Sequence, residues 1–366
     1  MFLNTYISDN ELKSISKKVL NNQRINLEEG IYLYDNADLA TLGYLSNFVR
    51  ESKNGNNTYF NKNLHIEPTN TCVYSCKFCS YYKKKDEEGW EYSQDEMLEM
   101  VKNAGEEITE VHIVGGVHPT WDVHFYGELF QKIKQIRPNI HIKAFTAVEI
   151  SYISKRSKMS IKEGLQTLKN YGLNSIPGGG AEIFDEEIRK QICGQKDTAA
   201  QWLSVHQTAH ELGIPSNATN IYGHIENTFH KVEHLNRLRE LQDKTGGFNV
   251  FIPLKFKNKN NELSYLNEVS IIEDVKMYAI SRIYLDNFPH IKAYWPMIGK
   301  DISQLLLSFG VDDFDGTIND TTKIYSRAGA DEQSPSMSTD EMIRLIKDAG
   351  RKPIERDSIY NIIKEY

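Results

Sequence analysis

The chain has 366 residues, of which 40% are hydrophobic and 25% are charged, enough for one large domain or two medium ones. Its formal net charge is −7 with both signs interspersed, so it lacks the basic footprint of nucleic-acid-binding proteins, and we expect no nucleic-acid partner. The N-terminus turns polar at once and no apolar run reaches the roughly 18 residues of a membrane span, so we expect a cytoplasmic protein without a membrane partner.

Serine caps mark several expected helix starts. The pattern S-x-x-E, typical of a capping box, occurs at Ser8, Ser93, Ser160, Ser270 and Ser338. After Ser160, apolar residues recur at helical spacing until Gly172, which suits a helix C-cap. The segment from Asp197 to Gly213 shows the same spacing. We expect amphipathic helices in both places.

Short β-rich runs alternate with these helices. We expect strands at 63–68, 110–115, 141–146, 173–178, 215–223, 248–256, 291–299 and 309–317. Eight strands separated by helices predict an α/β protein with a parallel (β/α)8 barrel of the TIM type. We expect an N-terminal helical extension at 1–60, the barrel at 61–320, and a C-terminal helical extension at 321–366 that packs on the barrel.

Unusual residues come just after the expected strands. They are the cysteines after the first strand, Gly115, Gly116 and His118 after the second, Thr146 and Glu149 after the third, Gly178, Gly179, Gly180 and Glu182 after the fourth, and His224 and Glu226 after the fifth. In a parallel barrel these positions meet at one rim, where active sites are built. The pattern therefore predicts an enzyme.

Three of the four cysteines, Cys72, Cys76 and Cys79, form a C-x-x-x-C-x-x-C loop. Clustered thiols in a reducing compartment indicate metal or redox chemistry rather than disulfides. Three thiolates on a [4Fe–4S] cubane leave one iron open to another ligand. The fourth cysteine, Cys193, is far along the chain and is expected to be buried and inert.

This spacing, with Phe78 just before the last cysteine, resembles the signature of the radical S-adenosylmethionine superfamily. The resemblance implies that the three cysteines hold a [4Fe–4S] cluster whose open iron binds S-adenosylmethionine. The alternatives are a zinc loop completed by His65 or another distant ligand, and a ferredoxin-like electron-transfer site.

The same resemblance implies a set of cofactor-binding residues. In "HIVGGVHP", Gly115 and Gly116 lack a Cβ, which allows their backbone to approach the methionine part of the cofactor. Glu182 in "PGGGAEIF" is a candidate for the ribose hydroxyls, and Glu149 in "FTAVEI", near Thr146, is a second. The glycine run lacks the lysine and the spacing of nucleotide phosphate loops.

Several longer stretches resemble the aminofutalosine synthases of the futalosine pathway to menaquinone: "HIEPTNTCVYSCKFCSYY", "GGVHP", "KAFTAVEI", "PGGGAEIF", "NATNIYGHIE", "FIPLKF" and "AGRKPIERDSIYN". The similarity covers nearly the whole chain. It implies that the 5′-deoxyadenosyl radical adds to 3-[(1-carboxyvinyl)oxy]benzoate, which rearranges and loses carbon dioxide to give 6-amino-6-deoxyfutalosine. S-adenosylmethionine is then a substrate, and an electron donor such as flavodoxin or ferredoxin is implied.

A substrate with two carboxylates requires cationic or hydrogen-bonding groups. Arg327, Lys255, His118 and His224 are candidates, and the two histidines could also move a proton. Related alternatives are dehypoxanthine futalosine cyclase and the deazaflavin-forming synthase. A cluster- or zinc-stabilised binding protein without activity would explain the cysteines but not the motifs after the other strands.

Overall fold

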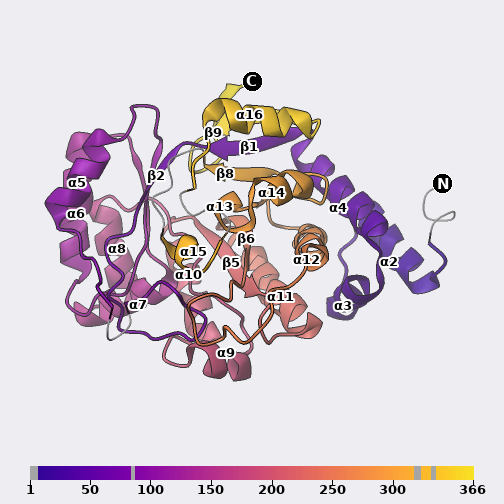
Figure 1. Ribbon diagram of the computed structural model, residues 1–366, viewed down its shortest axis with the longest axis horizontal. Helices are drawn as coiled ribbons and strands as arrows, with labels where there is room; N and C mark the ends of the chain where they lie inside the picture. Colours follow the sequence, from indigo (N-terminus) through magenta and orange to yellow (C-terminus); the bar gives the residue numbers. More distant parts are fainter. Residues whose placement is uncertain (1–6, 84–86, 317–322, 331–334) are drawn as a thin grey trace.

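The computed structural model describes residues 7–83, 87–316, 323–330 and 335–366 (Figure 1). Its helices are α2 (Asn10–Leu20), α3 (Leu27–Asn36), α4 (Leu39–Asn54), α5 (Gln94–Asn103), α6 (Val123–Ile136), α7 (Ala147–Arg156), α8 (Ile161–Tyr171), α9 (Glu186–Cys193), α10 (Ala199–Glu211), α11 (Thr228–Thr245), α12 (Ile271–Tyr284), α13 (Trp295–Ile298), α14 (Lys300–Leu306), α15 (Ile324–Arg327) and α16 (Thr339–Asp348). Its strands are β1 (Asn57–Asn61), β2 (Asn63–Ile66), β3 (Glu110–Ile113), β4 (His141–Ala144), β5 (Ser216–Tyr222), β6 (Phe248–Lys255), β7 (His290–Ile291), β8 (Asp313–Gly316), β9 (Lys352–Arg356) and β10 (Ile362–Glu365).

The central strands close into a parallel barrel. The strands β2, β3 and β4 pair in that order, as do β5, β6 and β7. Single parallel bridges join Lys143 to Ser175 and Ile176 to Ser216, so residues 175–176 fill the place between β4 and β5. A bridge from Lys292 to Asp313 joins the β7 side to β8, and β8 pairs with β1, which leads directly into β2. The expected (β/α)8 barrel is therefore confirmed.

All eight expected strands are shorter in the structure than the sequence suggested, and two of them differ most. Residues 173–178 form only isolated bridges, because the glycine run that follows turns the chain away after Ile176. In 291–299, only the first residue belongs to β7, and Trp295–Ile298 form α13, with Pro296 in its first turn. Proline lacks the N–H that a central strand needs but suits the start of a helix.

The N-terminal helices α2, α3 and α4 lie on one side of the barrel, where α4 packs on α12 and α3 on α11 (Figure 1). Arg50 of α4 is fully buried and donates hydrogen bonds to the carbonyl oxygens of Val311 at 3.1 Å and Asn57 at 2.6 Å. This guanidinium joins the helical extension to the barrel strands. The strand β1 begins at Asn57, before the boundary expected at residue 61.

The C-terminal extension differs from the expected helical one. Besides α16 it contains β9, which pairs in parallel with β1, and β10, which pairs antiparallel with β9. The sheet thus continues outward from the barrel and holds the end of the chain against it. The division into three parts stays a prediction.

The helix starts agree in part with the capping pattern. Ser93 and Ser160 make full capping boxes, and Ser338 caps α16. Ser270 precedes α12 but makes no capping hydrogen bond, and Asp9 takes the capping place expected for Ser8.

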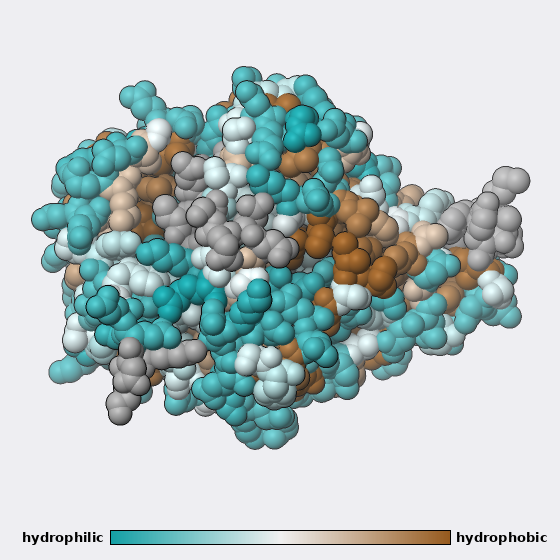
Figure 2. Space-filling model, in the orientation of Figure 1, coloured by the Kyte–Doolittle hydropathy of each residue, from teal (hydrophilic) through white to brown (hydrophobic). Residues whose placement is uncertain are grey.

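Hydrophilic residues cover most of the face in Figure 2. No helix in the described ranges is both long and apolar enough to cross a membrane.

Candidate active site

A cavity of about 300 Å³ occupies the mouth of the barrel. Residues of β2, β3, β4, β5, β6 and β8 line it, together with the loops that follow several of these strands. The expectation that the unusual residues meet at one rim is therefore confirmed for the cysteines, Gly115, Gly116, Thr146, Glu149, Glu182 and Phe78, which all line this cavity.

The cysteine loop folds over the mouth of the cavity between β2 and α5. The thiols of Cys72, Cys76 and Cys79 are all free. The backbone N–H of Cys79 donates to the carbonyl oxygen of Cys76 at 3.0 Å, and Cys72 Sγ accepts from the Val117 N–H at 3.3 Å. Cys193 is also free, but it is buried at the end of α9 on the outer side of the loop.

The donor set of this loop suits a [4Fe–4S] cluster, since thiolates hold such clusters and three of them leave one iron open. Across the described ranges, no three Cys, His, Asp or Glu side chains converge as ligands of one metal ion.

The thiols of Cys76 and Cys79 are neutral in the protein alone. Burial raises the pKa of Cys76 to about 12 and also raises the pKa of Cys79, while the Lys196 ammonium acts in the opposite direction on both. Because metal binding requires thiolates, loading a cluster would release these protons.

Lys196 and Glu182 form an ion pair of 2.5 Å at the cavity wall. The Lys196 Nζ also lies 5.3 Å from the ring centroid of Phe78. Burial opposes the charge of this lysine, but the Glu182 carboxylate holds its pKa well above the ordinary value. The backbone of Glu182 has a φ of 51°, a left-handed conformation that is costly for a residue other than glycine and that turns its carboxylate toward the cavity.

The glycine loop after β3 packs directly against the chain that leads into the cysteine loop. A Cβ on Gly116 would lie 2.3 Å from the carbonyl oxygen of Thr71, and one on Gly115 would lie 2.9 Å from that of Thr69. The Gly116 N–H also donates to Thr69 O at 2.7 Å. The two glycines therefore allow close packing against the cysteine loop, and their expected approach to the methionine part of the cofactor stays a prediction.

Thr146 and Glu149 begin helix α7 with a capping box. Glu149 Oε2 accepts from the Thr146 N–H at 2.6 Å, and Oε1 accepts from the Gly115 N–H at 3.3 Å. Burial nevertheless raises the pKa of Glu149 to about 7. The carboxylate thus lies in the cavity wall without a strong counter-charge.

None of the three residues singled out for substrate or proton roles lines the cavity. His118 is buried beside the rim, with Nε2 3.1 Å from a Glu91 carboxylate oxygen. Arg327 pairs with Glu87 at 2.7 Å and donates to the Ser80 carbonyl oxygen, so it holds the end of the cysteine loop.

The third, His224, is fully buried beyond the end of β5. Its Nδ1 accepts from the Ile225 N–H at 2.7 Å and lies 3.1 Å from Glu226 Oε2. Its Nε2 is buried without a partner within the described part of the chain. Burial lowers the pKa of the imidazole, which is therefore neutral at pH 7.

Lys255, the remaining candidate for a substrate carboxylate, does line the cavity. It ends β6, and its Nζ lies 2.8 Å from Asp274 Oδ2 on α12. The hydroxyl of Tyr222 donates to the other Asp274 oxygen at 2.8 Å. Asp274, itself held by the Tyr222 hydroxyl, thus orients the ammonium of Lys255.

Two further ion pairs at the cavity wall were not anticipated. Lys143 pairs with Glu110, and Lys292 pairs with Asp315, each at 2.5 Å. Each pair joins side chains from neighbouring strands or strand ends, so the partners are 33 and 23 residues apart in the sequence. The alternation of β3 and β4, which places polar side chains inside the barrel, is the signal that could have indicated the first pair.

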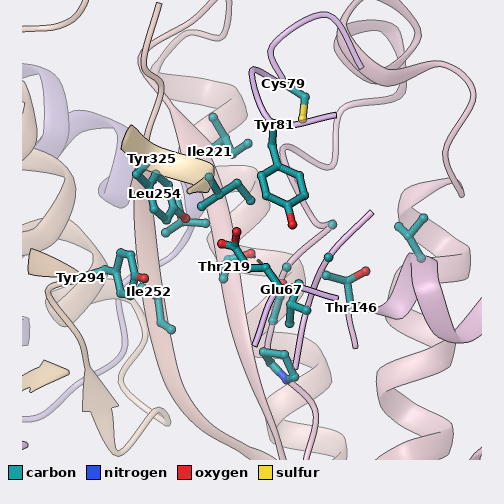
Figure 3. A pocket seen from close by; sticks show the side chains of 18 of the residues that line it. Glu67, Cys79, Tyr81, Thr146, Thr219, Ile221, Ile252, Leu254, Tyr294 and Tyr325 are labelled. Atoms are coloured by element: carbon teal, nitrogen blue, oxygen red, sulfur yellow. Dashed lines mark hydrogen bonds between the residues drawn. The ribbon is translucent and has the colours of Figure 1, made fainter. Parts of the chain in front are cut away.

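An apolar and aromatic wall lies on the β6 and β7 side of the cavity. Tyr294, Tyr325, Ile252 and Leu254 lie together there, and Tyr81 and Thr146 lie on the other side of the space (Figure 3). The rings of Tyr294 and Tyr325 are 5.2 Å apart between centroids. Such a wall suits the ring of an aromatic ligand.

The barrel, the open-ended thiol set and the rim motifs define a radical enzyme that uses an iron–sulfur cluster. The profile of the Radical SAM superfamily matches residues 66–238, and that of the CofH/MqnC C-terminal region matches residues 245–365. The chain belongs to the radical S-adenosylmethionine superfamily, in the group with this C-terminal region. Its cofactors are a [4Fe–4S] cluster and S-adenosylmethionine.

The chain is 41% identical to the aminodeoxyfutalosine synthase of Thermus thermophilus over 98% of its own length and 97% of that protein. Two proteins of Streptomyces coelicolor are also similar: an aminodeoxyfutalosine synthase, at 39% identity over 97% of this chain and 94% of that protein, and a cyclic dehypoxanthine futalosine synthase, at 35% over 96% and 88%. Methylornithine synthase shares the fold, with a TM-score of 0.75 at 16% identity over 93% of this chain and 97% of that one.

Proposed function

We propose that this protein catalyses the reaction of the aminodeoxyfutalosine synthases. The adenosyl group of S-adenosylmethionine would be joined to 3-[(1-carboxyvinyl)oxy]benzoate, giving 6-amino-6-deoxyfutalosine, carbon dioxide and methionine. The observation that carries the proposal is the full-length similarity to aminodeoxyfutalosine synthases in a chain whose three clustered thiols line one barrel cavity.

In this proposal Cys72, Cys76 and Cys79 hold the cluster at the mouth of the cavity. When bound, the cluster supplies the electron that cleaves S-adenosylmethionine into methionine and a 5′-deoxyadenosyl radical. Packing of the loop against α9 and the segment after β6 keeps water from the Cys76 thiol, since this residue is only 5% exposed.

The wall formed by the cysteine loop and the ends of β3 and β4 would hold S-adenosylmethionine. The residues assigned to it are Phe78, Gly115, Gly116, Thr146, Glu149 and Glu182. Glu149 suits the amino group of the methionine part, because its buried carboxylate makes no ion pair and can accept an N–H that this group keeps when its nitrogen binds the open iron. Glu182 suits the ribose hydroxyls, because a carboxylate can accept from both.

The opposite wall, on the β6 and β7 side, would hold the substrate. Its aromatic and aliphatic side chains suit the benzoate ring, and Lys255, oriented by Asp274, suits a carboxylate. His118, His224 and Arg327 remain candidates that would act through a neighbour, since none lines the cavity.

An external one-electron donor, such as flavodoxin or ferredoxin, would reduce the cluster. The test is an anaerobic assay with reconstituted protein, dithionite, S-adenosylmethionine and 3-[(1-carboxyvinyl)oxy]benzoate. The proposal expects an adenine-bearing adduct, identified by mass, together with carbon dioxide. Free 5′-deoxyadenosine, formed only with dehypoxanthine futalosine, would instead identify a cyclase.

A further inference from the structure

The short helix α15 supplies part of the cavity wall. Ile324 and Tyr325 of this helix line the cavity, as does Ala328 directly after it. The ring of Tyr325 packs on Tyr294 with 5.2 Å between centroids, and Figure 3 shows both rings on the same side of the space. The position of α15 therefore sets the shape of the aromatic wall that was assigned to the substrate.

This helix depends on other segments for its position. It has only four residues and no side-chain cap hydrogen bond, and isolated helices of this length are unstable in water. The Lys259 N–H donates to the Ala328 carbonyl oxygen at 3.3 Å, and the side-chain amide of Asn260 donates to the Arg327 carbonyl oxygen at 2.7 Å. These bonds attach α15 to the segment that follows β6.

The Arg327 side chain attaches the same helix to the cysteine loop. Its Nε donates to the carbonyl oxygen of Ser80 at 3.1 Å, and its Nη2 lies 2.7 Å from the Glu87 carboxylate. The Ser80 hydroxyl donates to the Lys259 carbonyl oxygen at 2.6 Å, and the side-chain amide of Asn261 donates to this hydroxyl at 3.2 Å. The cysteine loop, the segment after β6 and α15 therefore all meet at Ser80, which is buried.

Ser80 directly follows Cys79, one of the three proposed cluster ligands. Ligation of the Cys79 thiolate would hold this residue in place and restrict the residue that follows it. We propose that Ser80 and Arg327 are positioning residues that transmit this restriction to α15, so that loading of the cluster orders the aromatic wall for the substrate. The proposal rests on the proposed function, because it takes the aromatic carboxylate as the ligand of that wall.

The physical basis of this coupling is conformational entropy. A loop that moves freely gives Arg327 no fixed acceptor, whereas a fixed loop removes part of the cost of ordering α15 before the ring of the substrate binds. The side chains of Arg327 and Glu87 are 32% and 38% exposed, so their ion pair contributes little. The bond to the carbonyl oxygen of Ser80 is therefore the one that couples. Such coupling is reciprocal, so a bound substrate should also help to retain the cluster.

Hydrogen–deuterium exchange of residues 323–330 tests the coupling without any substrate. It compares the protein without its cluster and the cluster-loaded protein, in wild type and in Arg327→Met. Arg344→Met, which removes an exposed pair with Asp348 on α16, is the matched control. Arg327→Lys tests rescue, because an ammonium keeps a donor for the carbonyl oxygen of Ser80. Iron and sulfide content confirm equal loading, and calorimetry measures binding of S-adenosylmethionine and of 3-[(1-carboxyvinyl)oxy]benzoate.

Loading should slow exchange of residues 323–330 about tenfold in wild type and Arg344→Met, less in Arg327→Lys, and hardly at all in Arg327→Met. The aromatic carboxylate should bind loaded wild type about tenfold more tightly than loaded Arg327→Met, with KM raised in parallel and S-adenosylmethionine binding little changed.

Equal exchange of these residues in both forms of wild type would overturn the proposal, and this comparison needs no variant. An equal effect of loading in Arg327→Met and wild type would also overturn it. Product formation by wild type with dithionite tests the proposed reaction separately. A protein that orders α15 on loading but forms no adduct would overturn the proposed function alone.

Discussion

The Glu149 carboxylate accepts a 2.6 Å hydrogen bond from the backbone N–H of Thr146, yet no lysine or arginine in the described part of the chain forms an ion pair with it. The capping box at the start of α7 therefore places the buried Glu149 carboxyl in the cavity wall, where it makes no ion pair with a described residue. Burial sets the pKa of this acid at about 7. We propose that the positive charge of bound S-adenosylmethionine acts on this carboxyl.

The first prediction concerns the stability of the protein without cofactors. Because the pKa of Glu149 is raised on folding, the folded state binds more protons than the unfolded state between about pH 4.5 and 7. The free energy of unfolding should therefore fall as pH rises through this range. The rise in the pKa of Glu149 from 4.5 to about 7 corresponds to about 3 kcal/mol of unfolding free energy. Glu149→Gln should remove this pH-dependent contribution.

Urea unfolding of wild type and Glu149→Gln at pH 5 and pH 7.5 measures this difference. Glu163→Gln, which changes an exposed capping glutamate on α8, serves as the control and should keep the wild-type slope. An identical pH dependence in wild type and Glu149→Gln would show that Glu149 ionises normally.

The second prediction concerns S-adenosylmethionine binding. The positive sulfonium group of bound S-adenosylmethionine near Glu149 would lower the pKa of this carboxyl, so binding near pH 7 should release protons from it. Calorimetry of the cluster-loaded protein in two buffers of different ionisation enthalpy detects the release. Glu149→Gln should bind more weakly and release fewer protons, and an unchanged proton count would mean that Glu149 does not lie near the charge of the cofactor.

The third prediction separates the cysteines. Cys76→Ser should prevent cluster assembly, whereas Cys193→Ser should retain nearly wild-type iron and sulfide content, because Cys193 lies outside the cavity. Replacing this buried thiol with a hydroxyl costs roughly 1–3 kcal/mol of stability, which thermal unfolding can report. Equal loss of iron in both variants would mean that the cluster has four protein ligands.

The fourth prediction concerns Lys255 and the residue that orients it. Lys255→Met should raise KM for the carboxylate substrate about tenfold to a hundredfold, the effect of losing a charge-assisted hydrogen bond. Asp274→Asn keeps the lysine but loosens its orientation, so a smaller rise is expected. Lys244→Met, on the exposed face of α11, should leave KM unchanged. A KM insensitive to Lys255→Met would place the carboxylate elsewhere.

Local patterns predicted the elements that depend on neighbours in the sequence. The helix from Ser160 to Gly172 has its cap, its apolar spacing and its glycine stop all within one short segment. The cysteine spacing is local in the same way. The rim position of Glu149 and Glu182 followed from one global fact, that parallel strands end at the same side of a barrel.

Features that depend on distant contacts could not be predicted. The strand β9 exists because it pairs with β1, almost three hundred residues earlier, and its sequence has no clear alternation. The Lys143–Glu110 pair required knowing which strands are neighbours.

The most direct test is pulsed electron–nuclear double resonance on the reduced, cluster-loaded protein with S-adenosylmethionine labelled with ¹⁵N at its amino group. We predict a hyperfine coupling that shows the amino nitrogen bound to the fourth iron of a cluster ligated only by Cys72, Cys76 and Cys79. A spectrum that the labelled nucleotide leaves unchanged would contradict the account.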